Sequence, residues 1–502
     1  MVEQWGIYEI SVDGKSDGNP FVDYELIGVF QGAGETVRVD GFYDGEGSYK
    51  VRFMPSFTGR YSYEVFGNAL NQSIKGEFQV EAASEANHGP VRVAAQYHFA
   101  YEDGTPYYSV GTTCYAWTHQ IQARQQQTLA TLANGYFNKI RFCVFPKHYD
   151  YNFEDPITFP FHGKPMDKAL LTKLNFDDFN GNPSGNEWDF SRFNPAHFRN
   201  IERRIQDLME LGIEADLILM HPYDRWGFSE MTPEQDDRYF RYVIARLGAY
   251  RNVWWSLANE YDLMKTKTVS DWERYADTLV KNDPYRRLRS IHNCHPFYDH
   301  NRPWVTHCSI QHTETKLAAA WRARYQKPVV LDEIMYEGNI NHNWGNISAQ
   351  ELVRRFWDAA VRGGYAGHGE TYLEPDDILW WSHGGVLHGK SAQRLKFLHD
   401  ILSETPGLGL SYLPRSPFTP MRGEDPVAVP EDVQYLGSYY LLYFSMQRPS
   451  FKVFDMEDEY EYEAEVIDTW HMSIEKQGPF KGRFTVELPG REYIAIRIRR
   501  KK

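Results

Sequence analysis

The sequence predicts an α/β protein in which a (β/α)8 barrel is flanked by an N-terminal and a C-terminal β-sandwich. Residues 91–405 contain eight short apolar runs separated by helical segments, as expected for parallel strands joined by helices. Residues 1–85 and 406–502 instead alternate polar and apolar side chains, which is typical of strands with one solvated face. A chain of 502 residues is also too long for one ordinary core.

The N-terminal segment, residues 1–85, is expected to form an Ig-like sandwich. Two alternating runs, at residues 48–53 and 60–65, flank a turn at residues 55–59, and a third run follows at residues 75–80. Closely spaced strands joined by Gly and Asn turns are typical of small sandwiches. The polar segment that ends in Gly89-Pro90 predicts a linker before the barrel.

The barrel strands are expected in eight runs, at residues 107–113, 138–145, 213–221, 252–260, 287–292, 304–311, 328–333 and 364–371. Thr232, Ser270 and Ser348 each begin a predicted capping box, in which side chains satisfy the free N–H groups of a helix's first turn. The segment from about 146 to 195 is unusually long and rich in aromatic residues, Gly and Asn. We expect it to form one wall of a substrate cleft.

The C-terminal segment, residues 406–502, returns to strand-like alternation. Runs at residues 484–488 and 492–498 are joined by Pro489-Gly490-Arg491, and another run lies at residues 460–466. These runs predict a second β-sandwich.

Composition excludes several classes of function. The net charge of −14 disfavours nucleic acid and anionic membranes as partners. The sequence has no apolar run long enough to span a membrane and no secretory signal at its start, which predicts a cytoplasmic protein. Cys114, Cys143, Cys294 and Cys308 lack metal-type spacing and are expected to be buried free thiols. Aromatic residues make up 16% of the chain, a surplus that suits sugar-stacking surfaces.

Two buried runs end in a glutamate, and these glutamates are the candidate catalytic residues. Glu260 ends the run that begins at Asn252, and Glu333 ends the run at residues 328–333. A carboxylate at the end of a buried strand is too costly to bury without purpose, so each should open onto a cleft. Because the carboxyl ends of barrel strands meet at one face, we expect a carboxylate pair suited to glycosidic bond cleavage.

Strand alternation predicts which side chains share a face. Glu333 should share the barrel-facing side with Val329 and Leu331, while Asp332 points away. Arg141 should lie inside the barrel, where it needs a carboxylate; it pairs either with one of the glutamates or with a structural acid. If it pairs with a glutamate, that residue stays ionised as a nucleophile. Glu260, among Trp254, Trp255 and Tyr261, then suits the acid, because desolvation raises the pKa of a carboxyl group.

Further polar and aromatic residues lie at or just after the ends of the other predicted strands. A ring of His, Trp and carboxylate side chains would give a sugar hydroxyl partners and stacking faces. The candidate substrate-binding residues in this ring, besides Arg141, are His221, His312, His368, Trp380 and Trp381.

These residues together resemble the retaining glycoside hydrolases of clan A. The resemblance rests on Asn259-Glu260 ending strand four, Glu333 ending strand seven, Arg141 in strand two and a Trp after strand eight. It implies a (β/α)8 barrel, Glu260 as acid/base, Asn259 on the sugar 2-hydroxyl and Glu333 as nucleophile. Segments at residues 193–198, 328–338 and 364–372 are similar to a bacterial group of glycosidases with flanking β-sandwiches. The first strand lacks the Asp that some relatives carry there, so the resemblance does not predict the residues of the terminal sugar subsite.

Alternatives remain at several points. Glu337 rivals Glu333 as nucleophile, although Glu333 ends the buried run. A catalytic metal is disfavoured because strand one lacks a His-x-His motif, so neither a metal nor another cofactor is expected. The main alternative function is a catalytically inactive carbohydrate-binding protein on a barrel scaffold. A carbohydrate is the expected partner under both hypotheses, and homo-oligomer formation is left open.

Overall fold

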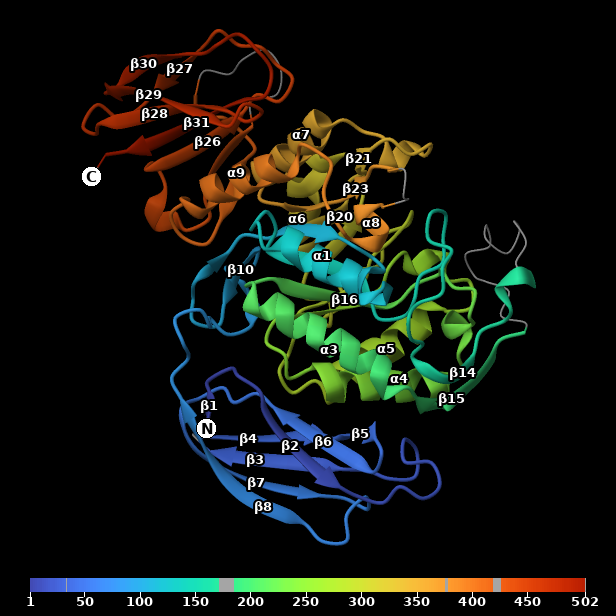
Figure 1. Cartoon of the computed structure of the whole chain (residues 1–502). Helices are drawn as coiled ribbons and strands as arrows, with labels where there is room; N and C mark the ends of the chain where they lie inside the picture. The colour runs from blue at the N-terminus through green and yellow to red at the C-terminus, as the bar shows by residue number, and fades with distance from the viewer. Residues whose placement is uncertain (33, 171–184, 375–377, 419–425, 502) are drawn as a thin grey trace.

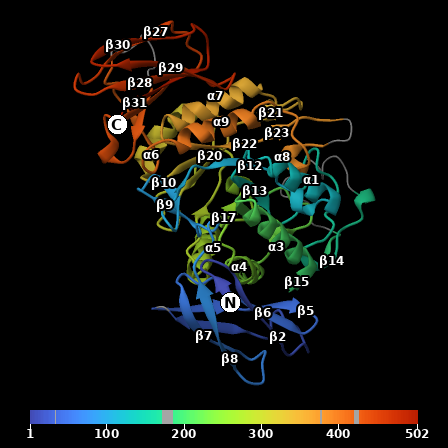
Figure 2. The same cartoon turned by 60° about the vertical axis from the view of Figure 1, so that its left-hand side comes forward.

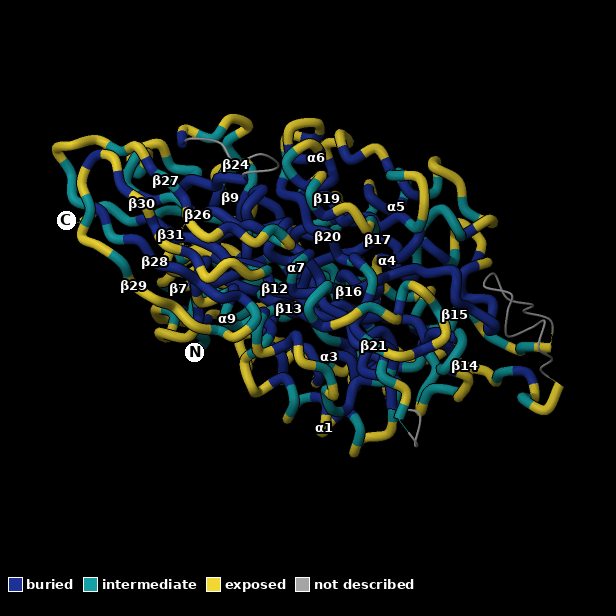
Figure 3. Tube along the Cα trace, turned by 90° about the horizontal axis from the view of Figure 1, so that it is seen from above, coloured by how far each residue is buried: buried dark blue, intermediate teal, exposed yellow. Residues whose placement is uncertain are grey.

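A central barrel separates two β-rich regions in the computed structural model of the chain (Figures 1 and 2). The structure describes residues 1–32, 34–170, 185–374, 378–418 and 426–501. The barrel has the densest burial, whereas exposed segments gather at the margins of the molecule (Figure 3). No helix within these ranges is long and apolar enough to span a membrane.

The N-terminal region contains two mostly antiparallel sheets packed around an aromatic core. One sheet has the strand order β1-β8-β7-β3-β4 and the other β2-β6-β5. The predicted runs at residues 48–53, 60–65 and 75–80 fall in β6, β7 and β8. The strands are β1 Val2–Glu3, β2 Tyr8–Asp13, β3 Ile27–Gly32, β4 Glu35–Asp40, β5 Phe42–Gly45, β6 Ser48–Phe53, β7 Gly59–Phe66 and β8 Ile74–Glu81.

A buried cluster of ion pairs holds this sandwich against the barrel helices. Arg52 Nη1 lies 2.7 Å from Glu202 Oε1, and the same oxygen lies 2.6 Å from Arg246 Nε. Arg246 Nη1 also lies 2.8 Å from Asp44 Oδ1 in the sandwich. Because each buried charge has an opposite partner, the desolvation of one is offset by the other.

Eight parallel strands form the barrel, and all eight predicted runs contain one. Their hydrogen-bonded order is β18-β17-β16-β13-β12-β22-β20-β19, and a parallel bridge between His292 and Ser309 joins the two ends. The strands are β12 Val110–Thr113, β13 Lys139–Cys143, β16 Glu214–Met220, β17 Val253–Ala258, β18 Arg289–Ser290, β19 Cys308–Gln311, β20 Val329–Glu333 and β22 Tyr365–His368.

Helices surround most of this sheet, but the fifth strand departs from the expected βα repeat. Residues 291–307 connect β18 to β19 without a helix, and Pro296 and Pro303 interrupt this stretch. The helices are α1 Gln122–Leu132, α3 Pro195–Glu210, α4 Pro233–Leu247, α5 Val269–Asn282, α6 Ala318–Tyr325, α7 Ala349–Ala360, α8 Trp380–His383 and α9 Ala392–Ser403. Short 3₁₀ turns lie at Trp117–His119, Lys168–Leu170, Phe228–Glu230, Tyr261–Leu263, Thr315–Leu317, Asn343–Gly345 and Val433–Tyr435.

The predicted helix starts are partly confirmed. Thr232 forms a complete capping box with Gln235 at the start of α4. Ser348 caps α7 by accepting the Glu351 N–H at 3.2 Å, whereas the Glu351 carboxylate pairs with arginines of the same helix. The predicted box at Ser270 is wrong: Thr268 caps α5 with Asp271, because Thr268 is the residue with extended backbone before the helix.

A small sheet closes the amino-terminal end of the barrel. Its strands are β9 Val91–Ala94, β10 His98–Tyr101 and β11 Pro106–Tyr107. The Phe99 ring on β10 lies 5.3 Å from the rings of Trp254 and Tyr365 (centroid to centroid). Trp254 therefore fills the bottom of the barrel.

The predicted orientation of Asp332 is wrong. Its carboxylate lies inside the barrel, where Oδ1 accepts from Lys139 Nζ at 2.7 Å and Oδ2 from Ser309 Oγ at 2.5 Å. Lys139 Nζ also donates to Asp216 Oδ2 at 3.0 Å. These partners hold the pKa of Asp332 below its ordinary value and offset the burial of its charge. The apolar side chains of Val329 and Leu331 instead join the cluster shared with the helices.

The long segment after the second strand contacts two different parts of the molecule. Its first residues, around Lys147 and Tyr149, lie beside the barrel mouth. The hairpin of β14 (Phe161–Lys164) and β15 (Glu187–Phe193) packs elsewhere, because Trp188 contacts Phe228 and Ser191 bonds to Asn19 of the sandwich. Residues 171–184, within the expected cleft wall, lie outside the described residues.

The C-terminal region forms a six-stranded sheet, β24-β25-β26-β31-β28-β29, and a two-stranded sheet, β27-β30. The strands are β24 Leu410–Leu413, β25 Val427–Pro430, β26 Tyr439–Tyr443, β27 Phe451–Asp455, β28 Tyr462–Asp468, β29 Ser473–Phe480, β30 Arg483–Glu487 and β31 Ile494–Arg500. α7 and α9 lie between this region and the barrel (Figure 1). Two further pieces, β21 Glu337–Gly338 and β23 Glu370–Thr371, pair beside the barrel mouth.

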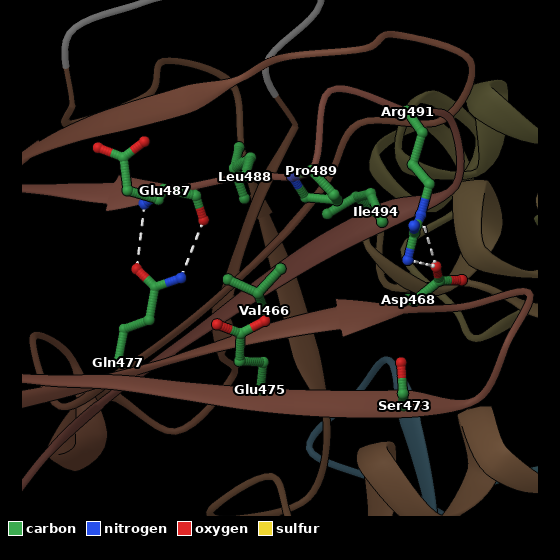
Figure 4. A pocket seen from close by; sticks show the side chains of 10 residues that line it. All are labelled: Val466, Asp468, Ser473, Glu475, Gln477, Glu487, Leu488, Pro489, Arg491 and Ile494. Carbon is green, nitrogen blue, oxygen red and sulfur yellow. Dashed lines mark hydrogen bonds and ion pairs between the residues drawn. The ribbon is translucent and has the colours of Figure 1, made fainter.

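A cavity of about 270 Å³ lies between the C-terminal strands (Figure 4). Several of its polar groups satisfy one another. Gln477 exchanges two hydrogen bonds of 3.0 Å with the Glu487 backbone, and Arg491 Nη2 lies 2.6 Å from Asp468 Oδ2. These internal pairings give no indication of a bound ligand.

Candidate active site

Asn259 and Glu260 follow the end of β17 and both face the barrel mouth. The Asn259 N–H continues the strand ladder by donating to Met220 O at 3.0 Å. Glu260 then adopts a left-handed φ of 48°, which breaks the alternation of the strand. As a result, Asn259 Nδ2 donates to Glu260 Oε2 at 3.3 Å. Such backbone conformations are uncommon outside glycine and concentrate at functional sites.

Glu333, the last residue of β20, lies across the mouth from Glu260. Arg141 Nη1 lies 3.7 Å from Glu333 Oε1, and the Tyr115 hydroxyl donates to the same oxygen. The closest partner of Arg141 is Asn259, whose Oδ1 accepts from Nη1 at 2.7 Å. Arg141 therefore connects the end of strand four with the end of strand seven.

Gln311 lies between the two glutamates. With its side-chain nitrogen facing them, this nitrogen is 3.1 Å from Glu260 Oε1 and 3.3 Å from Glu333 Oε2. The sum of the two distances, 6.4 Å, is the largest separation that these carboxylate oxygens can have. The structure thus brings the two sequence-predicted glutamates into one site.

Burial and the charge of Glu333 raise the pKa of Glu260 to about 8. Glu260 is 5% exposed, and desolvation makes the larger contribution. Lys147 and a hydrogen bond from the Cys294 thiol act in the opposite direction. Glu260 therefore holds a proton at neutral pH.

Of the three aromatic residues predicted to surround Glu260, two lie elsewhere. Trp254 lies at the far end of the barrel, and Trp255 Nε1 donates to Asp283 Oδ2 at 3.0 Å outside it. Tyr261, next to Glu260, packs against Trp272 and Tyr298.

An aromatic cage surrounds the ammonium group of Lys147. Its Nζ lies 3.6, 4.2 and 4.4 Å from the ring centroids of Tyr115, Tyr223 and Trp381. The Tyr149 ring is 5.6 Å away. Burial lowers the pKa of Lys147 to about 8, while Cys143, Glu260 and Glu333 oppose this effect.

The other predicted binding residues divide into two groups. Trp381 belongs to the mouth, where its ring also lies 5.1 Å from Trp344. His221 lies at its edge, with Nε2 3.2 Å from Phe145 O. Burial lowers the pKa of His221 to about 3, so the ring is neutral.

Three predicted residues are not brought to the glutamates. His368 Nδ1 lies 2.9 Å from Thr112 Oγ1, and Trp380 Nε1 donates to the same hydroxyl at 2.8 Å on the helix side of the barrel wall. His312 Nδ1 accepts from the Glu314 N–H at 3.0 Å, and its ring packs on Trp321. For His312, the register shift at the end of β19 brings the neighbouring Gln311 inward instead.

Glu337, the rival nucleophile, has a structural environment. It is fully buried, and its carboxylate accepts the backbone N–H groups of Lys390 at 2.8 Å and Ser391 at 3.1 Å. The Glu370 carboxylate accepts the two preceding backbone N–H groups, those of His388 and Gly389. The two carboxylates therefore hold the loop that follows α8, the helix that carries Trp381.

Sequence reasoning missed Tyr115, Lys147, Gln311 and Cys294 as residues of the site. Gln311 had a usable signal, because it ends β19, but the neighbouring His312 was chosen. A register shift in the pairing of β19 with β20, between Ser309 and Gln311, accompanies the inward position of Gln311. The described residues contain no group of three or more His, Cys, Asp or Glu side chains arranged to hold a metal ion.

Comparison with known proteins identifies the barrel. Residues 94–405 match the family described as apiosidase-like, catalytic domain. The flanking regions match two domains of unknown function, DUF5060 at residues 1–68 and DUF5605 at residues 428–499. No curated protein matches the sequence.

Two solved structures from Bacteroides vulgatus are similar over most of the chain. One, described as a putative glycoside hydrolase, shares 37% identity with a TM-score of 0.90, covering 100% of this chain and 99% of its own. The other, of glycoside hydrolase family 5, shares 14% identity with a TM-score of 0.61, covering 82% of this chain and 93% of its own, and supports the fold alone. The chain is therefore a glycosidase with flanking β-domains, and it belongs to the family with apiosidase-like catalytic domains.

Proposed function

We propose that the chain is a retaining glycoside hydrolase that uses Glu333 as nucleophile and Glu260 as acid/base. The observation that carries the proposal is the carboxylate pair bridged by Gln311. Retaining glycosidases hold their carboxyl groups about 5–5.5 Å apart, and inverting enzymes about 6.5–9.5 Å apart. The upper limit of 6.4 Å between the facing oxygens lies below the inverting range.

The differing surroundings of the two carboxyl groups support different roles. Glu333 faces Arg141 and the Tyr115 hydroxyl, which favour an ionised carboxylate able to attack the anomeric carbon. Glu260 is protonated at neutral pH and donates this proton to the leaving oxygen as the glycosidic C–O bond breaks.

The second step releases the sugar. Glu260, now ionised, removes a proton from water as the water oxygen attacks the anomeric carbon, and the bond to Glu333 breaks. This returns Glu333 to its carboxylate form and Glu260 to its acid form.

The bond cleaved is the O-glycosidic bond of an oligosaccharide or polysaccharide. Apiosides enter the list of candidate substrates because the family description names an apiosidase. In this proposal Asn259, held by Arg141 at 2.7 Å, binds the sugar 2-hydroxyl, and Trp381 borders the sugar ring. A binding protein without activity would not require one protonated and one ionised carboxyl group at this separation.

The test is a screen of aryl glycosides, including a 4-nitrophenyl apioside, and of plant and bacterial oligosaccharides. Glu333→Gln should remove nearly all turnover with an unchanged circular dichroism spectrum. Glu260→Ala should lower the rate about 10²–10⁴-fold on substrates that need leaving-group protonation, and less on activated aryl glycosides. Full activity in Glu333→Gln would refute the nucleophile assignment. Proton NMR of the first-formed anomer distinguishes retention from inversion.

A further inference from the structure

Lys147 is a buried cation whose ammonium group has no protein oxygen as a hydrogen-bond partner in the part of the chain that the structure describes. The residue is 3% exposed. Four aromatic rings lie within 5.6 Å of its ammonium nitrogen, with Tyr115 nearest at 3.6 Å. Ring faces attract a cation but accept no directed hydrogen bonds of ordinary strength.

The position of this group ties it to the two glutamates. Tyr115, under the ammonium, donates its hydroxyl to Glu333. Glu260 and Glu333 are also among the charges that act on Lys147. The cage therefore borders the space in which a sugar would lie against Glu333. The three N–H bonds of a buried ammonium need acceptors, and a ligand in this space can supply them.

We propose that Lys147 is a sugar-recognition residue that donates hydrogen bonds to hydroxyl oxygens of a neutral sugar bound between Glu260 and Glu333. This inference rests on the proposed glycosidase function and adds to it a residue that selects the sugar.

The charges of the site favour a neutral sugar over a uronic acid. Inside the barrel, Lys139 lies 3.0 Å from Asp216 and 2.7 Å from Asp332, and Arg141 adds a second cation to these two anions. At the mouth, the ammonium of Lys147 then balances the carboxylate of Glu333, while Glu260 carries a proton. A sugar carboxylate would add an anion without a free cation, next to Glu333.

The test compares wild type with Lys147→Met, which keeps the length and apolar bulk of the side chain. The exposed Lys281 of α5, also changed to Met, is the matched control. The substrates are 4-nitrophenyl glycosides of glucose, xylose, mannose, galactose, arabinofuranose and apiose, and 4-nitrophenyl β-D-glucuronide as the acidic member. Binding of the free sugars is measured by thermal shift in Glu333→Gln, with and without Lys147→Met.

Lys147→Met should lower kcat/KM on the cleaved neutral glycoside about 10–100-fold, the effect of losing hydrogen bonds from a charged donor. Its thermal unfolding midpoint should change little, because no protein hydrogen bond is lost and the apolar Met side chain still packs on the rings that lose their cation. Lys281→Met should keep full activity. Monodeoxy forms of the cleaved glycoside give the decisive comparison: one of them should be a poor substrate for wild type yet suffer no further loss in Lys147→Met.

Four results would overturn the inference. If Lys147→Met keeps wild-type kcat/KM, or if no monodeoxy glycoside shows coupling, Lys147 does not bind the sugar although the glycosidase stands. If the glucuronide is the preferred substrate and depends on Lys147, the neutral-sugar assignment fails. If wild type neither cleaves nor binds any member of the panel, the proposed function fails together with the inference.

Discussion

Replacing Glu333 by Gln should lower the pKa of Glu260. The negative charge of Glu333 opposes ionisation of Glu260, whose pKa stands at about 8. The facing oxygens are separated by at most 6.4 Å, the sum of their 3.1 and 3.3 Å distances to Gln311. At an effective dielectric constant of about 20, two unit charges at this distance repel by about 2.6 kcal/mol. Since 1.36 kcal/mol corresponds to one pKa unit, the pKa of Glu260 should fall by about 2.

The measurement is a carbon-13 NMR titration of protein labelled at the glutamate side-chain carboxyl carbon. The Glu260 signal is assigned by its loss in Glu260→Gln. Glu314→Gln, on the exposed loop after β19, is the control, and its distant, screened charge should leave the pKa of Glu260 unchanged. A Glu260 pKa that is equal in wild type, Glu333→Gln and Glu314→Gln would show that the two carboxyl groups do not share a site. This result needs no substrate.

Three further predictions follow from the same contacts. In wild type, kcat/KM should fall as pH rises through about 8, because Glu260 loses its proton. Cys294→Ala should move this decline to higher pH, because it removes a hydrogen bond that favours the ionised carboxylate. A decline at the same pH in wild type and Cys294→Ala would show that the thiol does not act on the pKa of Glu260. Tyr115→Phe removes the hydroxyl that donates to Glu333 and should lower kcat/KM about 10–100-fold in steady-state assays; wild-type kinetics would contradict this role. Burial raises the pKa of Glu214 to about 7, so between pH 4.5 and 7 the unfolded chain releases a proton that the folded chain keeps, and wild-type stability falls. Glu214→Gln should therefore gain in urea unfolding relative to wild type over this range, by at most about 3 kcal/mol, and a pH-independent difference would refute it.

Periodicity was sufficient to predict the barrel and the two flanking β-regions. Each barrel strand is buried on both faces, so it appears in the sequence as a short apolar run with turn residues at its ends. The missing helix after β18 was not predictable from strand spacing, because the connection of residues 291–307 is long enough to hold one. The start of α5 was misplaced by two residues because Thr268 and Ser270 are both good N-cap residues, and only the backbone conformation selects between them.

The site was predictable where chemistry and strand position agree. Glu260, Glu333 and Asn259 lie at the mouth because a polar residue at the end of a buried strand has few other stable places, and Arg141 from β13 and Trp381 from α8 lie there with them. Alternation failed where a strand end is irregular. It favoured His312 over the adjacent Gln311, and it placed Asp332 outside the barrel because the buried cation Lys139 that pairs with it lies on another strand.

The residues that sequence reasoning missed share a physical feature: each depends on partners from other strands. Lys147 looks like a surface lysine in a loop until the rings of Tyr115, Tyr223 and Trp381, from three separate connections, close around it. Trp381 lies in α8, and Glu337 and Glu370 fix the loop that follows this helix through the backbone N–H groups of the loop. The Trp381 carbonyl also accepts the Tyr115 N–H at 2.9 Å, so the cage forms only when segments far apart in the sequence come together.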